Sequence, residues 1–321
     1  MKPRRASLLL AASMAAVMAA SPTARGAFPD VWDAAATPRL ARDAKALREA
    51  QRVYLEARDL GTHSDGGRDL LLVVRMILEK DDAASSPDPR LPFLYGRVLV
   101  DMGDDARAAK VLRAALARAP SHPDASDAWF TLAIACARLG DPKSEIAAYD
   151  AQLATETDPM TRAVTLSNQA EAFVIIGDLD GAIARYRRSL ELAPDNALAR
   201  WGLAVALDRS GDAYGAQLEA RTALGFDPDA RRLTSSDVFF VPDYDKYWYL
   251  ALACAARASS TAEPPTQVLW WERAALSWKQ YIDNASPSDP WVAIARRRSD
   301  ACARELRAAR VRAARSRPLR H

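Results

Sequence analysis

Two consecutive stretches of 34 residues decide the fold: AVTLSNQAEAFVIIGDLDGAIARYRRSLELAPDN at 163–196 and ALARWGLAVALDRSGDAYGAQLEARTALGFDPDA at 197–230. Small residues, glycine and proline recur in the two stretches at the same places. The recurring pairs are Ala170 and Ala204, Gly177 and Gly211, Ala182 and Ala216, and Pro194 and Pro228. A fixed period of this length is typical of stacked helix-turn-helix units, each of which buries its apolar face on its neighbours.

The turn within each unit is marked by a Gly-Asp dipeptide. Such dipeptides begin at Gly103, Gly140, Gly177 and Gly211, at spacings of 37, 37 and 34 residues. Glycine adopts the left-handed conformation that ends a helix. The aspartate that follows can accept hydrogen bonds from the free amides that open the next helix. Four helix pairs are therefore predicted over 89–230.

The pattern resembles the tetratricopeptide repeat family, whose consensus has Trp, Leu, Gly and Tyr on the first helix and Ala, Phe, Ala and Pro on the second. Consensus places are filled in the first unit by Tyr95, Gly96, Leu99, Ala108, Leu112, Ala115 and Pro120, and in the second by Trp129, Leu132, Ala133 and Tyr149. The second unit departs from the consensus at Glu145, where alanine is expected. The resemblance implies an all-α helix-turn-helix solenoid that winds as a right-handed superhelix.

Less regular helix pairs are predicted on both sides of the four units, because the end units of solenoids are usually atypical. These helices are predicted at 39–60 and 68–80, within an N-terminal segment 27–88, and at 243–257 and 266–284, within a segment 231–288. A cap helix with an arginine-rich tail is predicted over 289–321, so that about thirteen helices are expected in all.

Residues 1–26 have the features of a secretory signal peptide. Basic residues precede an uncharged apolar stretch at 8–20 that is too short to cross a bilayer, and cleavage is predicted after Gly26. We therefore expect the chain to be exported to the periplasm. The alternative is an N-terminal anchor in the inner membrane. The mature chain is expected to contain no transmembrane segment.

The family resemblance also implies a binding surface, because members usually bind extended peptides or helices on a concave face formed by the first helices. The corresponding positions here are Phe93, Arg97, Phe130, Ile134, Val164, Asn168, Glu171, Trp201, Val205, Asp208 and Arg209. Their mainly apolar character favours a protein segment anchored by apolar side chains over a terminal carboxylate held by a Lys, Asn and Arg clamp. Trp201 is the strongest candidate anchor. The alternative is that the array covers these side chains by itself.

The stretch VFFVPDYDKYWY at 238–249 interrupts the 34-residue period with six aromatic side chains. Aromatic residues with polar tips are enriched at interfaces, so the stretch could form a recognition loop. It could instead fill a gap where the repeat geometry changes. The second interpretation is favoured because buried aromatic residues more often serve packing.

Residues that carry reaction chemistry are sparse. Adjacent His63, Ser64 and Asp65 cannot act as a catalytic triad, because neighbouring side chains on a turn point apart. The sequence contains no glycine-rich phosphate loop and no His-Glu-x-x-His zinc motif. The three cysteines have no metal-ligand spacing and are expected to be buried thiols. We expect no enzymatic activity, cofactor or metal.

The last 26 residues carry ten arginines against two acidic residues, a net charge of +8, whereas residues 27–295 carry −9. Seven arginines form the predicted basic surface: Arg296, Arg297, Arg298, Arg304, Arg307, Arg310 and Arg312. Such an asymmetry of charge is typical of a binding surface. Its partner here could be anionic lipid, an envelope polymer or the acidic array itself. A solvated helix is the alternative. Nucleic acid is not expected as a partner, because export would separate the protein from it. In addition, no aromatic residues lie among the arginines of the tail on which bases could stack.

Together these features predict an exported, non-enzymatic scaffold that binds a protein partner through an apolar concave groove, in an envelope assembly, secretion or export complex. The competing prediction is an envelope-surface or membrane-surface module that acts through its arginine-rich tail.

Overall fold

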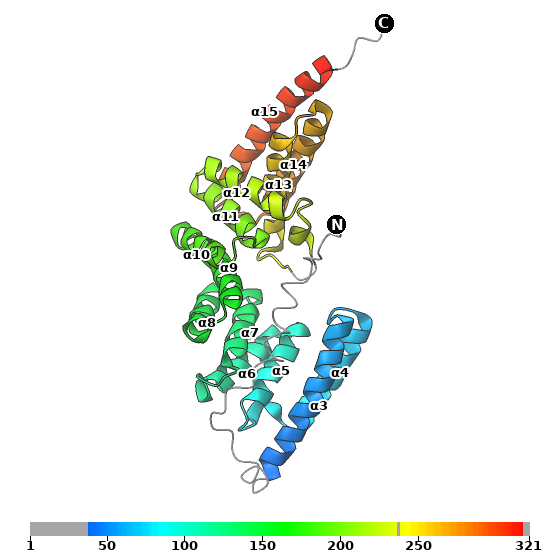
Figure 1. The fold of residues 1–321 in the computed structure, drawn as a ribbon, viewed down its shortest axis with the longest axis vertical. Coiled ribbons are helices and arrows are strands. Elements are labelled where there is room, and N and C mark those ends of the chain that lie inside the picture. The colour runs from blue at the N-terminus through cyan, green and yellow to red at the C-terminus, as the bar shows by residue number, and fades with distance from the viewer. Residues whose placement is uncertain (1–37, 236–237, 317–321) are drawn as a thin grey trace, which may run out of the picture. The chain divides into compact units, whose positions relative to one another are not determined.

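The computed structural model describes residues 38–235 and 238–316, and the predicted signal peptide at 1–26 lies outside them. In these two ranges the chain forms thirteen α-helices, three short 3-10 turns and no strand (Figure 1). The prediction of an all-α repeat protein with about thirteen helices is confirmed.

The helices are α3 (Pro38–Leu60), α4 (Asp65–Lys80), α5 (Arg90–Asp101), α6 (Asp105–Arg118), α7 (Ala125–Arg138), α8 (Pro142–Thr155), α9 (Pro159–Ile175), α10 (Leu179–Leu192), α11 (Ala197–Ser210), α12 (Ala213–Phe226), α13 (Lys246–Ser260), α14 (Pro264–Asn284) and α15 (Val292–Ser316). The 3-10 turns are η1 (Ala83–Ser85), η2 (Arg231–Thr234) and η3 (Asp243–Asp245).

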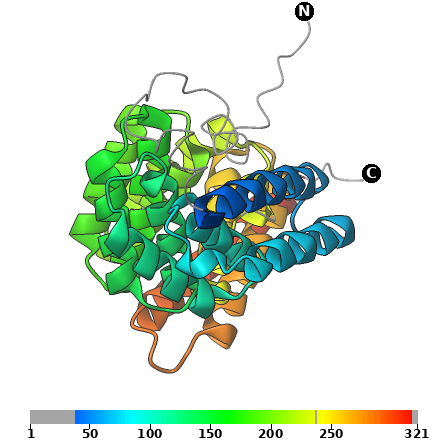
Figure 2. The same ribbon diagram turned by 90° about the horizontal axis from the view of Figure 1, so that it is seen from below.

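The chain divides into two compact units, residues 1–161 and residues 162–321. In the first unit the helices pair as α3 with α4, α5 with α6 and α7 with α8. The first helices of these pairs also pack in a row, α3 on α5 and α5 on α7. Figure 2 shows α3 and α4, in blue, lying side by side.

The second unit contains nearly all of α9 and continues to α15. Here α11 pairs with α12, α13 with α14, and α14 with α15, while α11 also contacts α13. Ser189 of α10 donates a hydrogen bond to the Ala163 carbonyl of α9 at 2.7 Å, which joins these two helices.

Each Gly-Asp dipeptide ends one helix and opens the next, as predicted. The φ angles of Gly103, Gly140, Gly177 and Gly211 are 80°, 69°, 83° and 100°. The amide of the following aspartate bonds to the carbonyl five residues earlier, as in the Schellman motif. Each aspartate carboxylate accepts a hydrogen bond from the amide three residues later, at 3.4, 3.1, 2.9 and 2.8 Å in chain order.

The paired helices approach closely where the sequence supplies small residues. Ala170 and Ala182, two of the small residues that recur in the sequence, are fully buried. At Gly202 a Cβ atom would lie 2.3 Å from Cζ of Tyr186, and at Gly96 it would lie 2.4 Å from Cγ of Leu112. Both glycines are therefore required by the contact between two helices.

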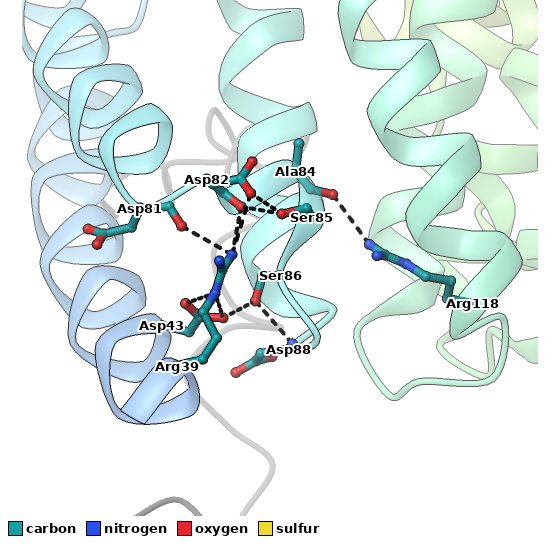
Figure 3. A network of polar contacts seen from close by, with 9 residues as sticks. All are labelled: Arg39, Asp43, Asp81, Asp82, Ala84, Ser85, Ser86, Asp88 and Arg118. Atoms are coloured by element: carbon teal, nitrogen blue, oxygen red, sulfur yellow. Dashed lines mark hydrogen bonds and ion pairs between the residues drawn. The ribbon is translucent and has the colours of Figure 1, made fainter. Parts of the chain in front are cut away.

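A polar network fixes α3 and α4 to the rest of the first unit (Figure 3). Asp43 is 1% exposed, and its carboxylate accepts hydrogen bonds from Arg39 at 3.0 Å and from the hydroxyl of Ser86. Arg39 also donates to the carbonyls of Asp81 and Asp82, at 3.3 and 3.0 Å. Because charge-assisted bonds to a buried carboxylate are strong, this network holds the start of α3 against the segment between α4 and α5.

Candidate protein-binding site

A cavity of about 70 Å³ lies between α3, α5 and α7, the first helices of three consecutive pairs in the first unit. The residues that line it are Gln51, Tyr54 and Arg58 of α3, Arg90, Phe93, Leu94 and Arg97 of α5, and Asp124, Asp127, Ala128 and Thr131 at the start of α7. Tyr54, Phe93 and Leu94 give the cavity apolar walls, and each is less than 9% exposed.

Arg97 is held in place at the wall of this cavity. Its Nε donates a hydrogen bond to Oγ1 of Thr131 at 2.9 Å, and that hydroxyl donates to the Asp127 carbonyl at 2.7 Å. The hydroxyl of Tyr54 donates to Asp101 at 2.7 Å. Burial alone would lower the pKa of Arg97, but nearby Tyr54, Asp101 and Asp127 raise it above its ordinary value. The guanidinium therefore stays charged.

The charges around the cavity have both signs. Burial raises the pKa of Asp127, and the attraction of Arg97 partly offsets that rise. Arg90 forms an ion pair with Asp88 at 2.7 Å, and this contact raises the pKa of Arg90. An apolar pocket with fixed donors and acceptors around it suits one apolar side chain whose flanking backbone is polar.

Sequence reasoning identified part of this site. Of the predicted groove residues, Phe93 and Arg97 line the cavity, whereas Phe130 packs edge-on against Tyr149 with ring centroids 5.8 Å apart. Ile134, Val164 and Asn168 are half-buried and lie outside the cavity.

Two walls of the cavity were missed. One comes from α3, which lacks the repeat consensus and was therefore not assigned to the binding surface. The other comes from Asp127 and Thr131, which lie on the edge of α7 that faces α5. Arg97 and Thr131 lie 34 residues apart, which is one repeat length, and this spacing could have predicted that they meet.

The four groove positions predicted on α11 are not open to solvent. Trp201, Val205, Asp208 and Arg209 are 0%, 1%, 2% and 4% exposed. The expectation of an accessible Trp201 anchor is therefore corrected. Trp201 and Val205 belong to an apolar cluster that contains α13 and α14 side chains, among them Trp248. The sequence period indicates which face of α11 points inward but not what covers it.

The covering segment is the aromatic stretch, for which the packing interpretation was favoured. Its described residues, 238–249, include fully buried Trp248 and Tyr249 at 6% exposed. The ring of Phe240 contacts Tyr249 edge-on at 5.0 Å between centroids, and Tyr244 contacts Tyr281 of α14 at 5.5 Å. Only Phe239, 41% exposed, is a large exposed aromatic residue of this stretch.

A buried ion pair ties this stretch to α11. Arg209 pairs with Asp245 of η3, and its guanidinium lies 4.5 Å from the ring centroid of Trp248 and 5.3 Å from that of Trp291. Burial raises the pKa of Asp245, and Arg209 opposes that rise. The neighbouring residue Asp208 accepts a hydrogen bond from the Trp248 indole at 3.0 Å. The inner face of α11 is thus bound by the chain's own side chains.

Glu171 of α9 is the remaining residue of the predicted groove. Burial, followed by repulsion from Asp245, raises the pKa of its carboxyl to about 8. Tyr186 and Tyr249 lie close to this carboxyl, and their pKa values are also raised, chiefly by burial. At neutral pH the Glu171 carboxyl is therefore mostly protonated.

This protonation predicts a pH-dependent stability. The unfolded chain releases the Glu171 proton near pH 4.5, whereas the folded chain keeps it up to about pH 8. The stabilising effect is complete below pH 4.5 and is lost as the pH rises toward 8, at up to about 1 kcal/mol per pH unit. We expect Glu171→Gln to remove this slope in urea unfolding measured from pH 5 to 8, and exposed Glu191→Gln to leave it unchanged. An unchanged slope in Glu171→Gln would show that Glu171 ionises normally in the fold.

The cysteines do not form a reactive site. Cys136 and Cys302 are buried, Cys254 is half-buried, and all three are free thiols. Burial raises the pKa of each of them. Among the residues that the structure describes, no group of three or more His, Cys, Asp or Glu side chains could hold a metal ion.

These helix pairs, with their left-handed glycine turns and small contact residues, define a helical-repeat protein. Comparison with known families specifies the class further. The family model described as "Tetratricopeptide repeat" matches residues 94–159, and one described as "TPR repeat" matches residues 170–211. Residues 94–159 and 170–211 therefore contain tetratricopeptide repeats. No curated protein matches it in overall sequence.

Several solved structures resemble the chain. They include MamA (16% identical, covering 62% of this chain and 100% of that chain, TM-score 0.48) and a tetratricopeptide repeat protein from Parabacteroides merdae ATCC 43184 (13%, 82% and 99%, TM-score 0.48). A third is YrrB, described as "a TPR protein with an unusual peptide-binding site" (13%, 70% and 97%, TM-score 0.42).

Proposed function

We propose that this protein is a scaffold that binds an extended protein segment on the first unit, with one apolar side chain of that segment in the cavity between α3, α5 and α7. The observation that carries the proposal is the cavity itself, because three consecutive first helices contribute to it. The tetratricopeptide repeats make a protein-interaction role the expected one for this class.

The size and lining of the cavity support this choice of ligand. About 70 Å³ corresponds to roughly two water molecules at their share of liquid volume. Water held between the rings and aliphatic groups of Tyr54, Phe93 and Leu94 has few partners, so an apolar side chain that displaces it gains affinity. The charged side chains of Arg90, Arg97 and Asp127 beside the apolar walls suit the polar backbone on either side of that anchor.

The cellular context in this proposal comes from sequence. The predicted signal peptide favours a periplasmic scaffold in an envelope assembly, secretion or export complex. In the part of the chain that the structure describes, no helix is long and apolar enough to cross a membrane. The fusion of a cleavage reporter to residues 1–26 would test export directly.

Filling the cavity tests the binding site. A peptide is first selected from a random phage library on the wild-type chain, and its Kd is measured by fluorescence anisotropy. Gln51, a half-buried lining residue, is then replaced by tryptophan. We expect Gln51→Trp to weaken binding by about 2 kcal/mol, roughly thirtyfold, because the bulky ring occupies the anchor position.

A matched control is Gln217→Trp, which places the same bulk at a half-buried helical position of α12. This variant should bind the peptide as tightly as the wild type does. Equal Kd values for Gln51→Trp and the wild type would contradict the proposal that the cavity is the binding site.

A further inference from the structure

The last helix, α15, uses one face for packing. Ala295, Cys302 and Ala309 recur at seven-residue spacing and are 0%, 4% and 0% exposed. These residues pack against α14, which lies alongside α15 (Figure 1). Arginine side chains must therefore project from the other sides of the helix.

Three of the eight arginines on α15 form ion pairs or hydrogen bonds with other side chains of the chain. Arg298 forms an ion pair with Asp208 of α11 at 2.8 Å, so one part of the predicted tail does return to the acidic array. Arg310 forms an ion pair with Glu272 of α14 at 2.8 Å. Arg312 donates a hydrogen bond to the side chain of Gln267 at 3.1 Å.

The other five arginines are exposed and form no ion pair or hydrogen bond with the residues that the structure describes. They are Arg296, Arg297, Arg304, Arg307 and Arg315. Arg297, Arg304 and Arg315 are separated by seven and eleven residues, which returns them to nearly the same side of an α-helix. At 1.5 Å per residue this row is about 27 Å long. Asp300 and Glu305 lower its net positive charge without reversing it.

We infer that this row of arginines docks on the phosphodiester headgroups of an anionic phospholipid bilayer. A row along one straight helix meets a plane with all its members at once. The planar guanidinium group of arginine matches phosphate oxygens with two parallel hydrogen bonds. The apolar face of α15 is already packed on α14, so the contact is peripheral and electrostatic. The inference is independent of peptide binding by the first unit.

The same face fits nucleic acid less well. The exposed residues of α15 are arginine, alanine, serine, valine, aspartate and glutamate, and none of them is aromatic. Bases therefore have no side chain on which to stack. Val311, 51% exposed, is the one large apolar residue on the exposed side.

The test is sedimentation of the full chain with vesicles containing phosphatidylglycerol, and with vesicles of phosphatidylcholine alone. The test variant replaces Arg297, Arg304, Arg307 and Arg315 by glutamine, which is also a good helix former. The control variant replaces four exposed arginines elsewhere that form no ion pair: Arg42, Arg48, Arg187 and Arg221. Circular dichroism confirms that both variants are folded.

We expect the wild-type chain to bind the anionic vesicles but not the neutral ones, and to be released as ionic strength rises. The test variant should bind on the order of a thousandfold more weakly, and the control variant within about twofold of the wild type. Equal binding of the test variant and the wild type would overturn the inference. So would loss of vesicle binding in competition with a short DNA duplex at equal phosphate concentration.

Discussion

Replacement of Trp201 by alanine is expected to lower the free energy of unfolding of the second unit by about 3–5 kcal/mol. The side chain is fully buried in the cluster that joins α11 to α13 and α14. Its indole N–H has no hydrogen-bond partner among the described residues, so the loss is one of packing. Urea unfolding followed by circular dichroism measures this change.

The matched control is Trp270→Ala in the same unit. Trp270 is half-buried, and the guanidinium groups of Arg257 and Arg273 lie 4.4 and 4.6 Å from its ring centroid. Loss of these cation–π contacts should cost about 1 kcal/mol. A cost for Trp201→Ala as small as that for Trp270→Ala would contradict the buried position of Trp201. If Trp201 were instead a surface anchor, its replacement would weaken partner binding without unfolding the chain.

The second large effect is expected from Arg209→Met, which leaves Asp245 buried without its counterion. Removal of one member of a buried ion pair typically costs about 3–5 kcal/mol. The cost should be greater at pH 8 than at pH 5, because an unpaired Asp245 can be buried neutral only after it takes up a proton. Urea unfolding of the variant at the two pH values measures both effects.

A double-mutant cycle separates the contribution of the ion pair to stability from the contribution of side-chain packing. Arg209→Met combined with Asp245→Leu should recover much of the stability lost in the single variant, because no buried charge is left. Removal of the exposed pair Arg310 and Glu272 should change stability by less than about 1 kcal/mol. Strict additivity at Arg209 and Asp245 would show that the two charges do not interact in the folded chain.

Local signals explain why so much of the fold could be predicted from sequence. The left-handed turn at Gly177 and the cap formed by the aspartate after it depend on residues within a few positions of each other. Gly202 and Tyr186 lie about half a repeat apart in the sequence, so their close contact follows from the period. Helix boundaries and contact positions could therefore be predicted before the structure was known.

The candidate site could be predicted only in part, because it depends on what each helix faces. Phe93 and Arg97 were identified from their repeat positions, but the contribution of α3 depends on the network around Asp43, which no repeat pattern encodes. The burial of Trp201 results from the path of residues 238–249, which is not periodic. On α15, composition indicates a basic helix but not that Arg298 pairs with Asp208.

In our proposal a protein segment binds at the cavity between α3, α5 and α7, while the inner face of α11 is filled by the chain itself. Hydrogen–deuterium exchange of the full chain, with and without the selected peptide, tests it most directly. We predict slower exchange on binding in α3, α5 and α7, at 38–60, 90–101 and 125–138, and no change in α11 or α13. Peptide-dependent protection confined to 197–210 and 246–260 would contradict the claim.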